Sequence, residues 1–387
     1  MKIMIAVLLA LLCFAPDDPP PPAKDNIRVG VILSTTGPLA AFGQDTKNGV
    51  ELAVKVINDA GGIEGRKLEI VFYDACSKPE EARVGASKLA EHEGVVAVIG
   101  CVASSLSLNA APVLQKAGIP MISPSSTNPT VTEQGDMIFR ACFMEEFQGS
   151  ALAWYTINDI KVEKAAILTN RDDPYSTGLG KYFKEKFVAL RGSVVAEESF
   201  TQGTVKYEIQ LANIKKSGAE VLFLPVYHND VALIAKQAEA LDLDVKLLGG
   251  DGWESSKLIE SAGSALKGAV FGSHYHRGYS DVASEYDKDY RKAFEKAPSS
   301  LAALGFDAVM LLQAALMTCA DYRGATIAEA LNDVKGCELA TGKDVEFDEN
   351  RNARKPLVMV KVGIEDIEFV RAVTVKEVEE AGKNDDD

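Results

Sequence analysis

Short apolar runs alternate along this chain with longer stretches whose apolar residues recur at helical spacing. Strands are typically short, apolar and β-branched, whereas an amphipathic helix repeats its apolar positions every three or four residues. The pattern predicts strands at Ile27–Leu33, Leu68–Tyr73, Val95–Gly100, Ile138–Cys142, Ala165–Thr169, Val194–Phe200, Val221–Pro225, Val245–Leu248 and Gly268–Gly272. It predicts helices at Gly43–Ala60, Glu80–Glu93, Ser104–Ala117, Tyr175–Leu190, Val205–Ser217 and Asp230–Leu241. Strands separated by such helices imply right-handed βαβ crossovers and therefore parallel sheets.

The alternation runs twice, with a break after residues 138–142, so we expect an α/β fold with two lobes. A length of 387 residues exceeds the usual size of one domain and agrees with this division. The last part of the chain predicts helices at Val282–Lys296 and Leu301–Cys319 and strands near Val345 and at Leu357–Val362. These elements must return to cover both lobes.

Residues 1–24 predict a signal peptide followed by a proline-rich linker. Lys2 precedes an apolar run from Ile3 to Phe14, which is shorter than a membrane span requires. Two processing routes are open: ordinary signal cleavage after Ala15, or lipidation of Cys13 with segment 16–22 as a stiff tether. Both routes predict a protein in the periplasm or on the outer face of the cytoplasmic membrane.

The formal net charge of −15 argues against a nucleic-acid partner, because phosphate binding needs clustered Lys and Arg. Part of that charge lies in an acidic tail, residues 376–387, which we expect to be solvated and disordered. The sequence contains no phosphate loop, dinucleotide fingerprint or nucleophile elbow, so we expect no enzyme activity and no cofactor. His274 and His276 predict a metal site only weakly, since no Cys or third His accompanies them.

Export makes disulfides possible among the cysteines that follow Cys13. Cys76 and Cys101 each follow a predicted strand and are expected at one sheet edge, where they would form a bridge. Cys319 and Cys337 flank a predicted helix and form a second candidate pair.

Polar and aromatic side chains gather where the predicted strands end. Ligands of parallel α/β sheets bind beyond the carboxyl ends of the strands. These ends lie at 34–38, 101–105, 123–127, 170–176, 226–229 and 249–253. The first run offers hydroxyls and the start of a helix at Ser104, whose unpaired N–H groups suit an anion. The second offers aromatic residues and Asp172, Asp173 and Asp251, so two facing edges would hold a small zwitterion by both ends.

Four stretches of the chain carry a resemblance to a known family. They read VGVILSTTGPLAAFGQDTKNGVELAVKVINDAGGIEGRKLEIVFYDAC, VIGCVASSLSLNAAPVLQKAGIPMISPSSTNPTVT, RDDPYSTG and PVYHND. They resemble the leucine/isoleucine/valine-binding family of type I periplasmic solute-binding proteins, over about residues 26–373. The resemblance implies two doubly wound lobes joined by three hinge strands that close on one ligand. We place the N-terminal lobe at 25–146 plus 274–352 and the C-terminal lobe at 147–273 plus 353–375.

By position, the resemblance also implies which residues hold the charged ends of an amino acid. Ser104 matches the serine that binds the carboxylate, and Ser125 and Thr127 match the backbone contact and the threonine of the second loop. Asp251 matches the acid that holds the α-ammonium, where family members carry a longer glutamate. Taken singly, Ser104 is typical of a helix N-cap and Asp251 of a turn, so the prediction depends on their common place at strand ends.

The resemblance assigns the wall of the side-chain pocket to aromatic residues. Phe42, Tyr175 and Tyr227 match this wall, with Phe42 in place of a tyrosine, and Trp253 and Tyr275 are further candidates.

The function that we expect is an extracytoplasmic receptor that binds an amino acid, most simply a branched-chain aliphatic one, and presents it to an ABC permease of the inner membrane. We expect a monomer. Two alternatives stay open: a receptor for amides, short peptides or aromatic acids, and a ligand sensor that acts through a membrane partner.

Overall fold

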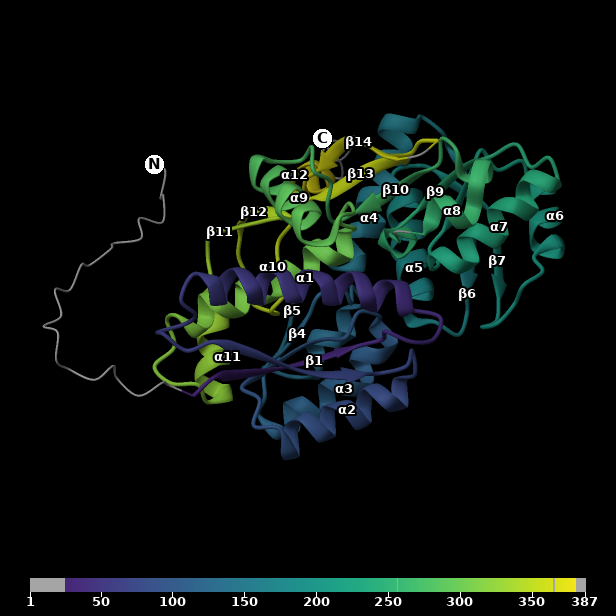
Figure 1. The fold of residues 1–387 in the computed structure, drawn as a ribbon. Coiled ribbons are helices and arrows are strands. Elements are labelled where there is room, and N and C mark those ends of the chain that lie inside the picture. Colours follow the sequence, from purple (N-terminus) through teal and green to yellow (C-terminus); the bar gives the residue numbers. More distant parts are fainter. Residues whose placement is uncertain (1–24, 256, 365, 381–387) are drawn as a thin grey trace, which may run out of the picture.

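The computed structural model describes residues 25–255, 257–364 and 366–380. Its main strands form two sheets side by side, and helices cover both faces of each sheet (Figure 1). The expected two-lobed α/β fold is therefore confirmed. The predicted signal peptide, its linker and Cys13 lie outside the described residues.

The first lobe contains a parallel sheet with strand order β2-β1-β3-β4-β5. Its strands are β1 (Ile27–Leu33), β2 (Leu68–Asp74), β3 (Ala97–Gly100), β4 (Met121–Ser123) and β5 (Ile138–Arg140). One face packs on α1 (Ala40–Asp59), α10 (Ser300–Leu316) and α11 (Gly324–Asn332), and the other on α2 (Pro79–His92) and α3 (Ser104–Ala117). β1 and β3 are apolar along nearly their whole length because both faces of the sheet are covered.

The second lobe contains a mixed sheet with strand order β14-β13-β10-β9-β8-β6-β7, in which β13 and β14 run antiparallel to their neighbours. Its strands are β6 (Lys164–Asn170), β7 (Ser193–Phe200), β8 (Val221–Leu224), β9 (Lys246–Gly249), β10 (Val270–Ser273), β13 (Leu357–Val362) and β14 (Ile367–Val373). Its helices are α4 (Glu145–Tyr155), α5 (Pro174–Ala189), α6 (Glu208–Ser217), α7 (His228–Ala240) and α8 (Leu258–Ala262). Shorter turns are η1 (Pro129–Gln134), η2 (Thr156–Ile160), η3 (Asp251–Trp253) and η4 (Gly263–Leu266).

The chain passes between the lobes after β5, after β10 and before β13. The first and third passages lie side by side, because Ala353 N donates to Arg140 O at 3.2 Å and Arg140 N donates to Arg351 O at 3.2 Å. Between the second and third passages the chain forms α9 (Asp281–Phe294), α10, α11 and the hairpin of β11 (Cys337–Leu339) and β12 (Gly342–Val345). Lys355, on the third passage, lies 3.5 Å from Asp307 of α10, and both side chains are buried. This buried ion pair holds the third passage against the first lobe.

Several elements differ from the sequence-based expectation. Helix α4 and strand β14 were not predicted; α4 has buried residues on all sides and therefore a weak helical periodicity. The acidic tail was predicted to be disordered, but its first residues form α12 (Val375–Glu380), which buries Val378 and accepts a hydrogen bond from Lys186 Nζ at Val378 O. Residues 381–387 lie outside the described part of the chain.

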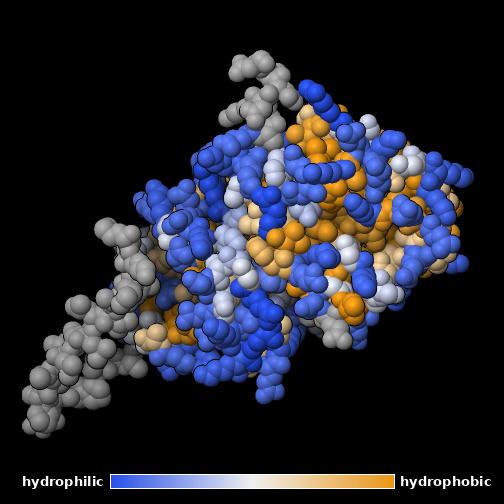
Figure 2. All heavy atoms as spheres, turned by 90° about the horizontal axis from the view of Figure 1, so that it is seen from above, coloured by the Kyte–Doolittle hydropathy of each residue, from blue (hydrophilic) through white to orange (hydrophobic). Residues whose placement is uncertain are grey.

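Seen from above, apolar atoms reach the surface between hydrophilic ones (Figure 2). The exposed large apolar side chains include Phe369 and Val370 of β14, which is an edge strand. Glu368 and Arg371 flank these residues, and charged side chains on an edge strand oppose pairing with another chain. No helix within the described residues is long and apolar enough to cross a membrane.

Candidate functional site

The first-lobe side of the site is formed where β3 and β4 end. Helix α3 begins at Ser104, and its cap position is held by Ala103, which makes no side-chain cap. Ser104 and Ser125 are almost fully buried and line one cavity between the lobes. Ser125 Oγ donates to Val102 O at 3.0 Å, and Ser104 Oγ accepts a long bond of 3.4 Å from Asn128 N. The cavity therefore faces the uncapped, partially positive start of a helix.

Thr127 lies next to this edge. Its Oγ1 atom is buried and has no hydrogen-bond partner, while its carbonyl oxygen accepts from Glu145 N at 2.9 Å. An unpaired buried hydroxyl is uncommon because it costs about 1–3 kcal/mol. Thr127 is 1% exposed and is not among the residues that line the cavity.

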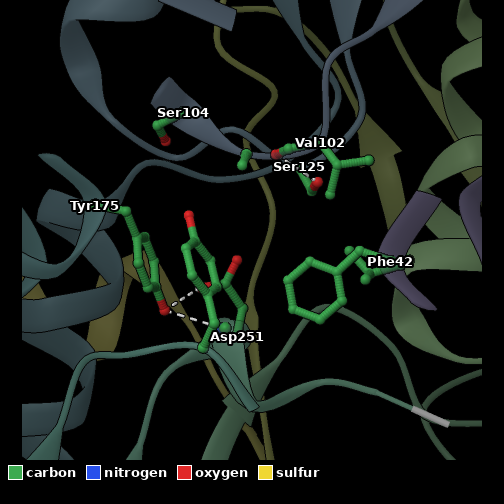
Figure 3. Close-up of a pocket in the computed structure, with 10 residues that line it drawn as sticks. Phe42, Val102, Ser104, Ser125, Tyr175 and Asp251 are labelled. Atoms are coloured by element: carbon green, nitrogen blue, oxygen red, sulfur yellow. Dashed lines mark hydrogen bonds between the residues drawn. The ribbon is translucent and has the colours of Figure 1, made fainter. Parts of the chain in front are cut away.

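The second-lobe side of the site centres on Asp251, the first residue of η3. Its Oδ1 atom accepts from Tyr175 Oη at 2.9 Å and from Gln148 Nε2 at 2.8 Å, and its Oδ2 atom lies 3.0 Å from His274 Nε2. Tyr175 Oη also accepts from Gly252 N at 2.9 Å. Burial raises the pKa of Tyr175 well above its ordinary value, and the charge of Asp251 raises it further, so the phenol keeps its proton and donates it. Figure 3 shows Tyr175 and Asp251 across the cavity from Ser104 and Ser125.

Aromatic rings connect the two sides. Tyr227 stacks on Tyr175 with ring centroids 5.1 Å apart, and its edge meets Phe42 of the first lobe at 5.6 Å. Phe42 also lies 4.8 Å from the ring of His228. Burial lowers the pKa of His228 to about 4, so this imidazole packs as a neutral ring. The lobes are therefore in contact through Phe42.

The cavity that remains between the lobes is about 20 Å³, room for roughly one water molecule. It is lined by Phe42, Val102, Ala103, Ser104, Ser125, Tyr175, Tyr227, Asp251, Gly252 and Leu301. The structure thus brings six of the seven sequence-predicted residues to one small cavity, and Thr127 is not among the residues that line it.

Two polar residues that contact Asp251 were not predicted from the sequence. Gln148 lies on the unpredicted helix α4, and His274 directly follows β10. His274 was considered only as a metal ligand, together with His276, but His276 Nε2 lies 3.2 Å from Ile367 O instead. Among the described residues, no cluster of His, Cys, Asp or Glu is arranged to hold a metal ion. His274 lies just beyond the predicted strand Gly268–Gly272, and this place at a strand end is the sequence feature that could have identified it as a site residue.

The two further candidates for the pocket wall lie elsewhere. Trp253 is fully buried and donates from Nε1 to Leu224 O at 2.9 Å, so it is part of the core of the second lobe. Tyr275 lines a separate, larger groove of about 820 Å³ together with residues such as Arg277 and Asp366.

All five cysteines in the described part of the chain are free, which corrects the two expected disulfides. Strand β1 lies between β2 and β3, the strands that Cys76 and Cys101 follow. Cys76 lies in the turn after β2 and directs its Sγ atom to Asp74 O at 3.6 Å, while Cys101 is buried directly after β3. Cys319 lies just beyond α10 and directs its Sγ atom to Leu316 O, at the end of that helix, at 3.6 Å. Cys337 of β11 is likewise free.

Comparison with known proteins identifies the family to which this fold belongs. The sequence profile of the periplasmic binding protein family matches residues 26–366. The Leu/Ile/Val-binding protein homolog 1 of Brucella suis is 31% identical over 335 residues, which cover 86% of this chain and 88% of that protein. The chain belongs to the leucine/isoleucine/valine-binding family of periplasmic binding proteins.

Solved structures of related periplasmic binding proteins share the fold. The leucine-binding protein LivK of Thermotoga maritima is 30% identical with a TM-score of 0.86, covering 91% of this chain and 99% of that one. LivJ of Streptococcus pneumoniae, solved in complex with isoleucine, is 30% identical with a TM-score of 0.83, covering 89% and 99%. The doubly wound lobes and hinge expected for this periplasmic binding protein are thus confirmed.

Proposed function

We propose that this protein is the extracytoplasmic solute-binding component of an ABC transporter, and that it binds a branched-chain amino acid between its lobes. One observation carries this proposal: the uncapped start of α3 and the carboxylate of Asp251 face each other across a single cavity. An anion is stabilised at the first and a cation at the second. An amino acid carries both groups on one carbon atom. The relatives named for leucine, isoleucine and valine support a branched-chain aliphatic side chain on this ligand.

The α-carboxylate would bind the start of α3, Ser104 Oγ and the backbone at Ser125. Thr127 Oγ1 would gain the partner that it lacks here. Charge-assisted hydrogen bonds of this kind contribute about 1.5–3 kcal/mol each. Asp251 would take the ammonium group.

The side chain would lie against Phe42, Tyr175 and Tyr227, which offer an apolar wall. A cavity of about 20 Å³ does not admit an amino acid, so binding requires the lobes to part at the hinge and close again. We propose the lobe boundaries at 146, 273 and 352, which the sheet membership of β5, β10 and β13 supports. The partner would be an inner-membrane permease, and the binding protein itself a monomer.

Calorimetric titration with leucine, isoleucine, valine, phenylalanine, acetamide and benzoate tests the proposal. We expect the three branched-chain amino acids to bind most tightly and Asp251→Asn to weaken them at least about tenfold. Asp172→Asn is the matched control, since Asp172 is exposed and away from the cavity. Tighter binding of acetamide or benzoate than of any amino acid would overturn the proposed ligand class.

A further inference from the structure

We infer that Gln148 and His274 are positioning residues for Asp251: they fix its two oxygens from two different segments and leave one acceptor site for a ligand cation. The inference deepens the proposed function and rests on it. Gln148 belongs to α4, which begins after the first passage between the lobes, and His274 lies at the start of the second passage. The orientation of Asp251 therefore depends on both passages as well as on its own loop.

The hydrogen-bond count supports one vacant acceptor site. An ionised carboxylate has about four lone-pair sites. Tyr175 and Gln148 occupy two on Oδ1, and His274 occupies one on Oδ2. The fourth is on Oδ2, and Asp251 is only 7% exposed while it lines the cavity. A carboxylate held by three donors is preorganised, so a ligand does not have to order it on binding.

The contacts of His274 indicate that it donates without adding a positive charge. Its Nδ1 atom is buried and has no hydrogen-bond partner, and its ring stacks on Phe143 with centroids 3.8 Å apart. A second proton on Nδ1 would have no acceptor. Burial lowers the pKa of His274, against the opposing effect of Asp251, and the Lys355 ammonium lowers it further.

Gln148 is also uncharged, and Tyr175 keeps its proton, so all three donors to Asp251 are neutral. The negative charge of Asp251 is therefore not cancelled by its own partners. A buried anion in this state is stabilised by a cation that arrives with the ligand. We thus assign to Gln148 and His274 the preference of the site for ligands that carry an ammonium group.

The test compares leucine with isocaproate, which is leucine without its amino group. Both are titrated calorimetrically into the wild-type chain and into Gln148→Leu, His274→Leu and His274→Gln variants. A glutamine amide reaches the place of Nε2 and donates without becoming charged, so His274→Gln serves as the rescue variant. His276→Leu is the matched control, because His276 lies on the same segment and contacts Ile367 rather than Asp251.

We expect Gln148→Leu and His274→Leu to lower the preference for leucine over isocaproate at least about tenfold, through weaker leucine binding alone. His274→Gln and His276→Leu should keep the preference within about threefold of the wild type. Equal weakening of both ligands would show a merely structural role and overturn the inference, as would unchanged binding of both. If His274→Leu fails to fold, Gln148→Leu and His274→Gln decide. A wild-type chain that binds no amino acid of the panel would instead overturn the proposed function itself.

Discussion

The rings of Phe42 and Tyr227 meet edge to face with their centroids 5.6 Å apart, although one belongs to the first lobe and the other to the second. Phe42 is 2% exposed: it packs into the core of the first lobe and also contacts the rings of Tyr227 and His228 in the second. Burial of a phenylalanine side chain contributes about 1.5–3 kcal/mol. The contact between Phe42 and Tyr227 therefore stabilises the closed arrangement of the lobes and forms part of the cavity wall.

We predict that Phe42→Ala raises the dissociation constant for the tightest amino acid about 10- to 100-fold, because closure then buries less apolar surface. Isothermal titration measures this change directly. Phe72→Ala is the control, since Phe72 is 36% exposed on β2 and outside the cavity. Equal affinities of the wild type and Phe42→Ala would remove Phe42 from the site.

Thr127 provides a second prediction because its buried Oγ1 atom has no partner. Thr127→Val keeps the shape of the side chain and removes the hydroxyl. We expect at least about tenfold weaker amino-acid binding, and a free energy of unfolding without ligand that is unchanged or higher. Urea unfolding and calorimetry separate the two effects. In the control Thr318→Val, an exposed hydroxyl near the end of α10 is lost and affinity should stay constant. Weaker folding with unchanged affinity would mean that the hydroxyl is structural.

Much of this site could be predicted because strand ends are visible in the sequence. Apolar runs placed the ends of β3 and β9, and the residues that follow them include Ser104 and Asp251. Parallel strands direct such ends to one edge of each sheet, so the residues of each half of the site were expected together. β3 and β9 belong to different sheets, and that the two edges face each other was implied by the family resemblance.

The partners of Asp251 could not be predicted in the same way. Gln148 and His274 reach it only through the packing of α4 and the path of the second passage, which depend on contacts between distant segments. The error about Cys76 and Cys101 has a related cause. Strand order is a tertiary property, and the sequence pattern does not show that β1 lies between β2 and β3.

Glu145 gives a prediction on pH. Its carboxyl group is 1% exposed, and Oε1 accepts from Asn128 Nδ2 at 3.0 Å. Burial raises its pKa to about 9, with Arg140 opposing and Asp251 adding to the shift. The folded chain thus holds a proton that the unfolded chain releases above about pH 4.5, so stability falls as the pH rises from about 4.5 to about 9.

Glu145→Gln should remove this dependence. We expect equal stability near pH 4.5 and a growing advantage of the variant up to pH 8, by at most about 1.4 kcal/mol per pH unit. Urea unfolding at a series of pH values measures it, with the exposed neighbour Glu146→Gln as the control. A difference between Glu145→Gln and wild type that does not vary with pH would contradict the assigned protonation state.

Glu254 joins the lobes close to the loop that carries Asp251. Its Oε1 atom accepts from Ser300 N, at the start of α10 in the first lobe, at 3.0 Å. Its Oε2 atom accepts from Ser273 Oγ at the end of β10, at 2.9 Å. A carboxylate at the start of a helix is favoured by the partial positive charge there. The bond to Ser300 exists only when the lobes are together, so it favours the closed form.

Glu254→Ala should therefore shift the free protein toward the open form. The ligand enters the open form, and the lobes then close on it, so loss of the bond to Ser300 destabilises the closed, liganded form relative to the open, free form. We therefore expect amino-acid binding to weaken about tenfold. Small-angle X-ray scattering should show a larger radius of gyration without ligand and a wild-type value at saturation. Glu260→Ala, which removes an exposed carboxylate from the same groove, should change neither quantity. An unchanged radius of gyration together with wild-type affinity would mean that closure depends on the aromatic contact of Phe42 and Tyr227 without help from Glu254.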